Sequence, residues 1–175
     1  MIVEKLGTAG GGFPSPMAAH AERAAAGRSV RILLVDDDTA ELEKLRKALA
    51  AGHREISLVQ AHSVEAGFKA FDNHDLVITD RQLNPAGLGW EGVELTAKIK
   101  AARPETVVVI NSAFPPVPEG KSDLEPDYVH AKGLGTVIKK GEHKSLIPTD
   151  GIVEGYENLS KLVGEIERDR FKMTQ

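Results

Sequence analysis

Short apolar runs alternate with stretches of helical periodicity along most of this sequence, from Ser29 onward. Such alternation is typical of a parallel β-sheet whose strands are joined by crossover helices. We therefore predict an α/β protein with a doubly wound, five-stranded parallel sheet in the strand order 2-1-3-4-5. The predicted strands are Val30 to Val35, Ile56 to Ala61, Leu76 to Thr79, Thr106 to Asn111 and Thr136 to Ile138.

The first predicted helix has both a start signal and an apolar face. Asp38 and Glu41 have the spacing of a capping box, in which each side chain accepts a hydrogen bond from the other residue's backbone N–H. Leu42, Leu45 and Leu49 recur on one face of the helix that follows. The sequence therefore predicts that a helix begins directly after the first strand and packs on the sheet through its leucines.

The segment between the fourth and fifth predicted strands departs from this rhythm. Prolines interrupt it, and each proline removes a backbone donor and disfavours a helix. We therefore predict a reduced fourth helix, with at most a short helix around Asp127 to Lys132. The prolines are Pro115, Pro116, Pro118 and Pro126.

The first 28 residues differ in composition from the remainder of the chain. Gly10 to Gly12, Pro14 and Pro16 precede an alanine-rich stretch, and this composition buries little apolar surface. We predict a flexible or partly helical N-terminal arm over residues 1–28 and one domain over residues 29–175.

Composition excludes several classes of function. Lys and Arg number 22 against 26 Asp and Glu, giving a formal net charge of −4, which does not fit a nucleic-acid binder that works by net charge. The absence of cysteine excludes disulfides, thiolate metal sites and thiol nucleophiles. No apolar run approaches the roughly 20 residues that span a bilayer, and no apolar signal segment follows Lys5. We therefore expect a cytoplasmic protein with no membrane or nucleic-acid partner.

Polar residues follow four of the five predicted strands. The carboxyl ends of neighbouring strands in an open parallel sheet face one crevice, so these side chains are expected to converge. Closely spaced carboxylates repel one another unless a cation neutralises them, and oxygen ligands favour a hard divalent ion such as Mg²⁺. The residues are Asp36, Asp37 and Asp38 after the first strand, Asp80 after the third, Ser112 after the fourth and Lys139 after the fifth.

The same residues predict a chemistry. With Mg²⁺ on Asp36 and Asp37, Asp80 would place one oxygen on the metal and keep the other to attack a phosphoryl group. Lys139 would supply a positive charge, and Ser112 a hydroxyl donor, for the phosphoryl oxygens. We therefore predict Mg²⁺-dependent formation of an aspartyl phosphate.

Four segments carry a family resemblance: Ile32 to Asp38, Leu76 to Asp80, Ser112 to Ala113 and Val137 to Lys139. In this order they resemble the receiver domain of bacterial two-component response regulators. The resemblance implies a flavodoxin-like fold in which Asp80 is the phosphoacceptor and Asp36 and Asp37 are the acidic pair. It further implies that the backbone carbonyl of Gln82 is a metal ligand. Ser112 and Lys139 would then contact the phosphoryl group.

The resemblance also implies partners. A stand-alone receiver takes its phosphoryl group from a phosphohistidine on a sensor histidine kinase or a phosphotransfer protein. It catalyses only its own phosphorylation and dephosphorylation, is not a metabolic enzyme, and acts by binding a downstream protein, here unknown, as a monomer or weak homodimer. This chain is atypical between strand 4 and helix 5, and Lys140 stands where the family has a proline.

Two other functions fit parts of the pattern. A receiver-like binding module that works without phosphorylation would explain the atypical segment after Ser112. A phosphatase of the haloacid dehalogenase type also uses an aspartyl nucleophile, Mg²⁺, a hydroxyl and a lysine. That class requires Thr or Val at the position of Ala40 and a late acidic pair, whereas here the acidic pair comes early.

Overall fold

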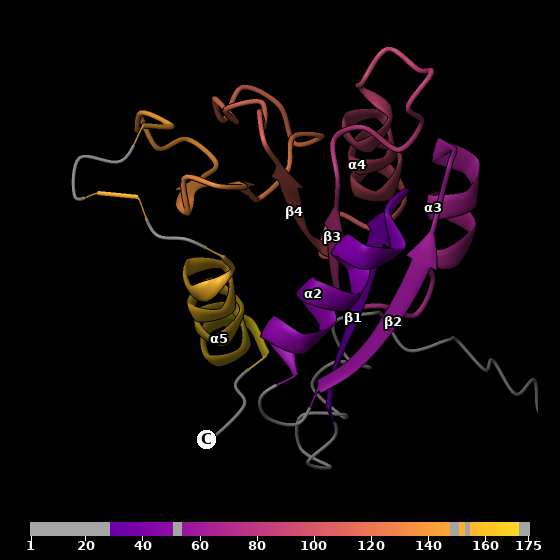
Figure 1. Ribbon diagram of the computed structural model, residues 1–175, viewed down its shortest axis with the longest axis horizontal. Coiled ribbons are helices and arrows are strands. Elements are labelled where there is room, and N and C mark those ends of the chain that lie inside the picture. The colour runs from indigo at the N-terminus through magenta and orange to yellow at the C-terminus, as the bar shows by residue number, and fades with distance from the viewer. Residues whose placement is uncertain (1–28, 51–53, 148–150, 153–154, 172–175) are drawn as a thin grey trace, which may run out of the picture.

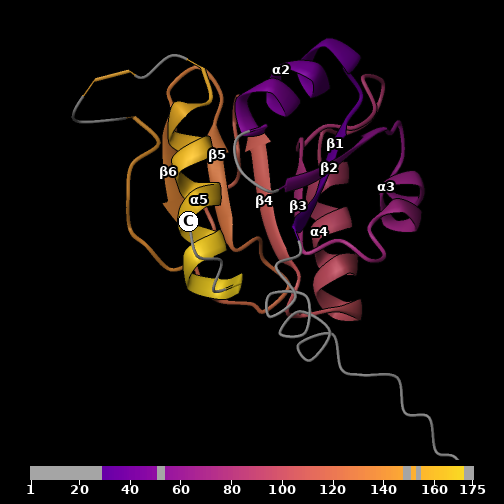
Figure 2. The same cartoon turned by 90° about the horizontal axis from the view of Figure 1, so that it is seen from below.

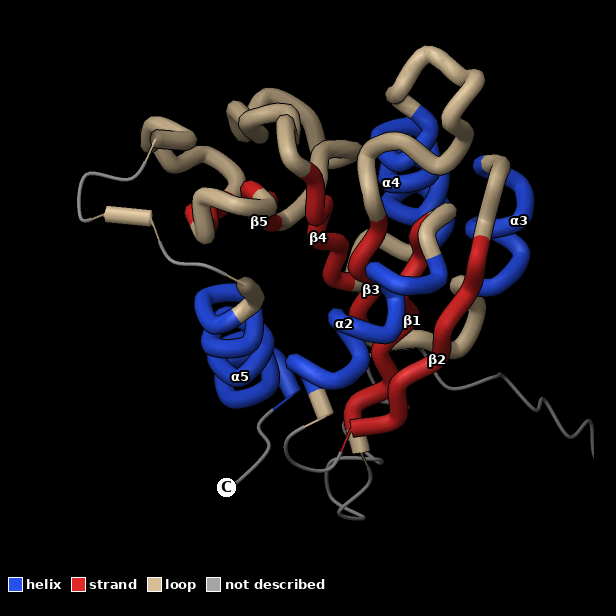
Figure 3. The backbone as a smooth tube through the Cα atoms, viewed as in Figure 1, coloured by secondary structure: helices blue, strands red, loops and turns tan. Residues whose placement is uncertain are grey.

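The computed structural model of the chain describes residues 29–50, 54–147, 151–152 and 155–171, so the predicted N-terminal arm lies outside the described residues (Figure 1). The helices and strands of the described part alternate along most of the chain, as Figure 3 shows in blue and red. In chain order they are β1 (Val30–Asp36), α2 (Thr39–Leu49), β2 (Arg54–Gln60), α3 (Val64–Ala70), β3 (Leu76–Thr79), α4 (Glu91–Ala102), β4 (Val107–Ser112), β5 (Tyr128–Ala131), β6 (Thr136–Lys139) and α5 (Glu157–Phe171).

The strands form a single sheet in the order β2-β1-β3-β4-β5-β6. The first five positions are parallel, and β6 pairs antiparallel with β5. The predicted α/β class and the flavodoxin-like order 2-1-3-4-5 are therefore confirmed. The predicted count of five strands is one too low because an additional antiparallel strand extends the edge of the sheet.

Helices cover both faces of the sheet (Figure 2). Leucines of α2 and α5, including Leu45 and Leu159, are buried against one face. Residues of α3 and α4, including Val64 and Leu95, are buried against the other. Both faces of the sheet are thus covered by helices, and its carboxyl edge is left for polar chemistry.

No helix in the described part of the chain is long and apolar enough to cross a bilayer.

The start of α2 matches its prediction only in part. The Asp38 side chain accepts hydrogen bonds from the N–H groups of Ala40 and Glu41, so it caps the helix. The backbone N–H of Asp38 donates instead to Oδ1 of Asp36 at 3.0 Å. The second hydrogen bond of the predicted capping box, from the Asp38 N–H to the Glu41 carboxylate, is therefore replaced by the bond to Asp36. The Glu41 carboxylate can then extend toward the sheet.

The fifth parallel strand was predicted at the wrong place. Residues 128–131, predicted as a short helix, form β5 beside β4, whereas Thr136–Lys139, predicted as the fifth parallel strand, forms the antiparallel β6. Residues 113–127, all of them described, contain no helix. Gly133 and Gly135 have positive φ angles of 79° and 69°, and they turn the chain back into the β5–β6 hairpin.

A buried ion pair joins the amino ends of β4 and β5 to α4. The Lys100 ammonium donates to Oδ2 of Asp127 at 2.9 Å and to the carbonyls of Pro104 and Thr106 at 2.7 and 3.1 Å. The same Asp127 oxygen accepts the N–H of Val108 at 2.9 Å. Only 4% of the lysine side chain and 9% of the aspartate side chain are exposed. This pair fixes the position at which β5 enters the sheet.

Candidate functional site

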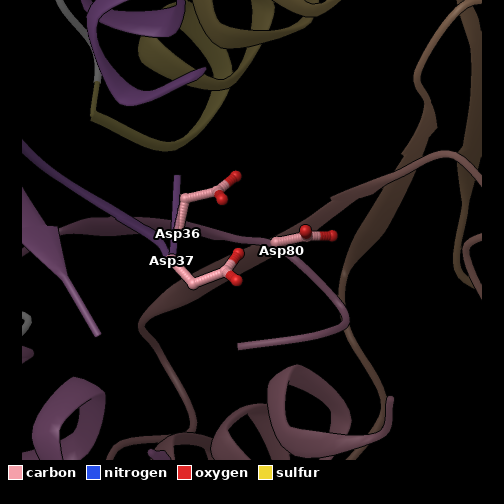
Figure 4. A group of neighbouring side chains, drawn as sticks. All are labelled: Asp36, Asp37 and Asp80. Atoms are coloured by element: carbon pink, nitrogen blue, oxygen red, sulfur yellow. The ribbon is translucent and has the colours of Figure 1, made fainter. Parts of the chain in front are cut away.

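Three carboxylates meet at the carboxyl edge of the sheet. Asp36 ends β1, Asp37 follows it, and Asp80 follows β3. One carboxylate oxygen from each residue lies within 4.8 Å of those of the other two, which is a spacing that one cation can bridge (Figure 4). The structure therefore brings together the three side chains predicted as metal ligands.

Parallel pairing sets this convergence. Val35 on β1 is in register with Thr79 on β3, so the next residue of each strand reaches the edge at the same level. The N–H of Asp80 donates to the carbonyl of Val35 at 2.9 Å, which extends the ladder by one bond. Gly92 allows the start of α4 to pack against this turn, because a Cβ at Gly92 would overlap the carbonyl oxygen of Asp80.

Lys132 is the lysine of this site. It directly follows β5, and its backbone N–H donates to the carbonyl of Ser112 at 2.8 Å, which brings it level with the end of β4. Its ammonium lies 3.3 Å from Oδ2 of Asp36, 3.6 Å from Oδ2 of Asp80 and 4.0 Å from Oε1 of Glu41. The lysine side chain is 21% exposed, so the solvent screens these contacts only in part.

Lys139, the lysine predicted for the site, lies at the other end of the sheet. It pairs with Tyr128, the first residue of β5, because β6 runs antiparallel. Its side chain is exposed, and its backbone N–H is 3.3 Å from the Glu142 carboxylate. The prediction placed Lys139 at the end of a parallel strand. The reversal of β6 removes it from the carboxyl edge.

Ser112 and Gln82 complete the predicted set. Ser112 is the last residue of β4 and is 6% exposed, which places it on the carboxyl edge next to β5. Gln82 lies two residues after Asp80, and its side-chain amide donates to the carbonyls of Asn84 and Pro85 at 3.2 and 3.4 Å. The Gln82 side chain therefore forms hydrogen bonds within its own loop. Its predicted role as a metal ligand requires only the backbone carbonyl.

The local electrostatics favour uptake of a cation. Burial is the largest cause that raises the pKa of Asp80. The charge of Asp36 raises it further, against the opposing ammonium of Lys132. Burial and then the charge of Asp36 raise the pKa of Asp37. Ionising these two groups therefore costs folding free energy in the metal-free protein, and this cost appears as the pH rises through their raised pKa values.

Because ionisation of Asp37 costs folding free energy, its removal has a predictable effect on stability. Asp37→Ala should leave the metal-free protein no less stable at pH 7, because it removes a carboxylate that Asp36 repels. Solvent screens the half-exposed side chain, so we expect a gain below about 1 kcal/mol. Thermal melts in EDTA at pH 7 and pH 4 measure it, and the gain should shrink at pH 4, because the raised pKa of Asp37 lets that carboxylate take up a proton as the pH falls. Strong destabilisation at pH 7 would contradict the sign.

Sequence reasoning missed two members of this cluster, Lys132 and Glu41. The signal for Lys132 was present, because Tyr128 and Val129 favour strands and the lysine comes soon after them. Glu41 was interpreted as a capping residue, and no sequence pattern indicates that its carboxylate reaches across to a residue 91 positions later, at Lys132.

Comparison with known proteins gives structural matches only. No protein-family model and no curated protein sequence matches the chain. A response regulator receiver domain protein from Clostridium thermocellum is 25% identical, with a TM-score of 0.40 over 47% of this chain and 64% of that chain. The response regulator TrrA from Thermotoga maritima, in complex with Mg²⁺-BeF, is 29% identical, with a TM-score of 0.42 over 49% and 70%. The receiver domain of the Francisella response regulator 1452 is 16% identical, with a TM-score of 0.48 over 59% and 84%.

These matches are receiver domains, and they cover between 47% and 59% of this chain. The chain spans less than two thirds of the Clostridium thermocellum domain, at 64%. In strand order and in the acidic cluster at the carboxyl edge, the chain resembles a receiver domain.

Proposed function

We propose that this chain is a phosphoacceptor signalling domain, phosphorylated on Asp80 in a Mg²⁺-dependent reaction and acting through protein–protein interaction. One observation carries the proposal: Asp36, Asp37 and Asp80 meet at the carboxyl edge with the ammonium of Lys132 between Asp36 and Asp80. A signalling receiver of this kind is not a metabolic enzyme.

The donor set fits Mg²⁺. Three carboxylates offer hard oxygen ligands that lie within 4.8 Å of one another. Burial, and then the negative charge of Asp36, raise the pKa values of Asp37 and Asp80, and a bound cation would offset that repulsion. Asp36, Asp37 and Asp80 would hold the ion, with the carbonyl of Gln82 as a further ligand. When bound, Mg²⁺ supplies positive charge for the phosphoryl oxygens.

The proposed step is transfer from a phosphohistidine. An oxygen of the Asp80 carboxylate attacks phosphorus, the phosphorus–nitrogen bond breaks, and its electron pair stays on the imidazole, which takes up a proton. The N–H of Arg81 donates to Oδ1 of Asp80 at 2.6 Å and orients the carboxylate. Lys132 and the Ser112 hydroxyl would then bind the transferred phosphoryl oxygens. The donor would be a sensor histidine kinase or a phosphotransfer protein.

Intact mass spectrometry tests this function. After incubation with Mg²⁺ and acetyl phosphate, we expect one phosphoryl group on the wild-type protein and none on Asp80→Asn, because an amide is not a nucleophile here. Asp123→Asn, at an exposed position outside the site, is the matched control and should label like wild type. A wild-type protein that binds Mg²⁺ without becoming labelled would be a phosphorylation-independent binding module, contrary to the proposal.

A further inference from the structure

Glu41 belongs to the electrostatic environment of the phosphoacceptor although it is on a helix. It lies in the first turn of α2, and only 17% of its side chain is exposed. Its two carboxylate oxygens face two different lysines: Oε1 is 4.0 Å from the Lys132 ammonium and Oε2 is 3.4 Å from the Lys44 ammonium. Glu41 therefore bridges a surface lysine and the lysine of the site.

The turn before α2 makes this contact possible. A glutamate three residues after a helix cap commonly accepts the backbone N–H of the capping residue. Here Asp36 accepts the N–H of Asp38 instead, so one aspartate both caps this turn and contacts Lys132 through its other oxygen. The Glu41 carboxylate is left to extend toward the same ammonium.

The contact between Glu41 and Lys132 matters because of the negative charge around this ammonium. Three carboxylates lie within 4.0 Å of the Lys132 ammonium, those of Asp36, Asp80 and Glu41. Asp37 adds a fourth negative charge to the cluster through its proximity to Asp36 and Asp80. A phosphoryl group on Asp80 adds negative charge and requires the same ammonium for its oxygens. Glu41 opposes that state in two ways, because it competes for Lys132 and its charge repels the phosphoryl oxygens.

We propose that Glu41 is a positioning residue that holds the Lys132 ammonium partly away from the phosphoryl position and so limits how tightly the site retains a phosphoryl group. This inference builds on the proposed phosphoacceptor function of Asp80. Glu41 acts through Lys132 and contacts neither the predicted ion nor the reacting atoms.

Calorimetric titration with beryllofluoride at saturating Mg²⁺ tests the role. Glu41→Gln should bind beryllofluoride about threefold more tightly than wild type, as expected for removing one partly screened charge. Glu41→Asp keeps the charge and should stay close to wild type. Glu43→Gln is the matched control, since Glu43 lies in the same helix and pairs with Arg46 at 2.8 Å, away from the site.

A second measurement separates positioning from a structural effect. The side-chain carbon resonances of Lys132 should move in Glu41→Gln and remain in place in Glu43→Gln, and the lifetime of the phosphorylated form should lengthen only in Glu41→Gln. Equal or weaker beryllofluoride binding by Glu41→Gln would overturn the inference. A wild-type protein that binds no beryllofluoride and accepts no phosphoryl group would overturn the phosphoacceptor function itself, which is a distinguishable outcome.

Discussion

Lys132→Ala is expected to weaken beryllofluoride binding about tenfold or more, whereas Lys139→Ala should leave it unchanged. A hydrogen bond to a charged group is worth about 1.5–3 kcal/mol, and of these two lysines Lys132 is the one whose ammonium lies 3.6 Å from Oδ2 of Asp80. The same substitution should strengthen Mg²⁺ binding, because it removes a cation that lies 3.3 Å from Asp36. Calorimetry with Mg²⁺ alone, and then with beryllofluoride at saturating Mg²⁺, measures both signs.

Unfolding of the Lys132→Ala variant could not produce the expected result, because the affinities for beryllofluoride and Mg²⁺ are expected to change in opposite directions. A variant that simply unfolds loses both ligands, whereas the expected Lys132→Ala protein gains affinity for one and loses it for the other. Lys139→Ala serves as the matched control, because both lysines lie at the ends of neighbouring strands and differ in the end of the sheet that they reach. Loss of beryllofluoride binding in Lys139→Ala with retention in Lys132→Ala would contradict the structure of the β5–β6 hairpin.

Asp127→Ala is expected to reduce the free energy of unfolding by about 3–5 kcal/mol. Its carboxylate accepts the Lys100 ammonium and the Val108 N–H inside the protein, so its removal leaves a buried ammonium without its counter-charge. Arg170 also approaches its other oxygen at 3.8 Å. Urea unfolding followed by circular dichroism measures the loss.

Two further variants identify the cause of that loss. Asp123→Ala, at an exposed position of the same loop, should unfold within about 0.5 kcal/mol of wild type. The double variant Lys100→Met with Asp127→Ala should recover part of the stability, since it removes the unpaired charge. A double variant less stable than Asp127→Ala alone would show that the pair is not the source of the effect.

β1, β3 and β4 were predictable because their sequences are nearly continuous β-branched or aliphatic runs that are buried on both faces. The four residues of β4 from Val107 to Ile110, for example, are completely buried. β2 lies at the edge of the sheet and has no fully buried residue, and its shorter apolar run was still sufficient to indicate a strand. β5 gave a weaker signal, because His130 interrupts its apolar run. The structure buries that histidine and places its Nδ1 atom 2.7 Å from Oδ1 of Asn111 on β4, and burial lowers its pKa to about 4. A cross-strand partner of this kind is not visible in a local pattern.

The site was predictable where the backbone alone positions it. Asp36 ends β1 and Asp80 directly follows β3, and these strands pair in register, so their convergence needs only the strand order. To predict which lysine belongs to the site, one would have to know the direction of the last strand. A strand that ends in Lys139 places this lysine at the carboxyl edge only if the strand is parallel to its neighbours. To predict that Glu41 joins the site, one would have to know that the N–H of Asp38 donates to Asp36 and not to Glu41. That hydrogen bond is determined only in the folded turn.

The most direct test of the central claim is chemical localisation of the phosphoryl group. Borohydride reduces an aspartyl phosphate to homoserine, so peptide mass spectrometry after phosphorylation and reduction reports the modified residue. The phosphoacceptor function predicts homoserine at position 80, only in samples incubated with both Mg²⁺ and the phosphodonor. Homoserine at another aspartate, or a phosphorylated protein in which Asp80 remains unreduced, would contradict it.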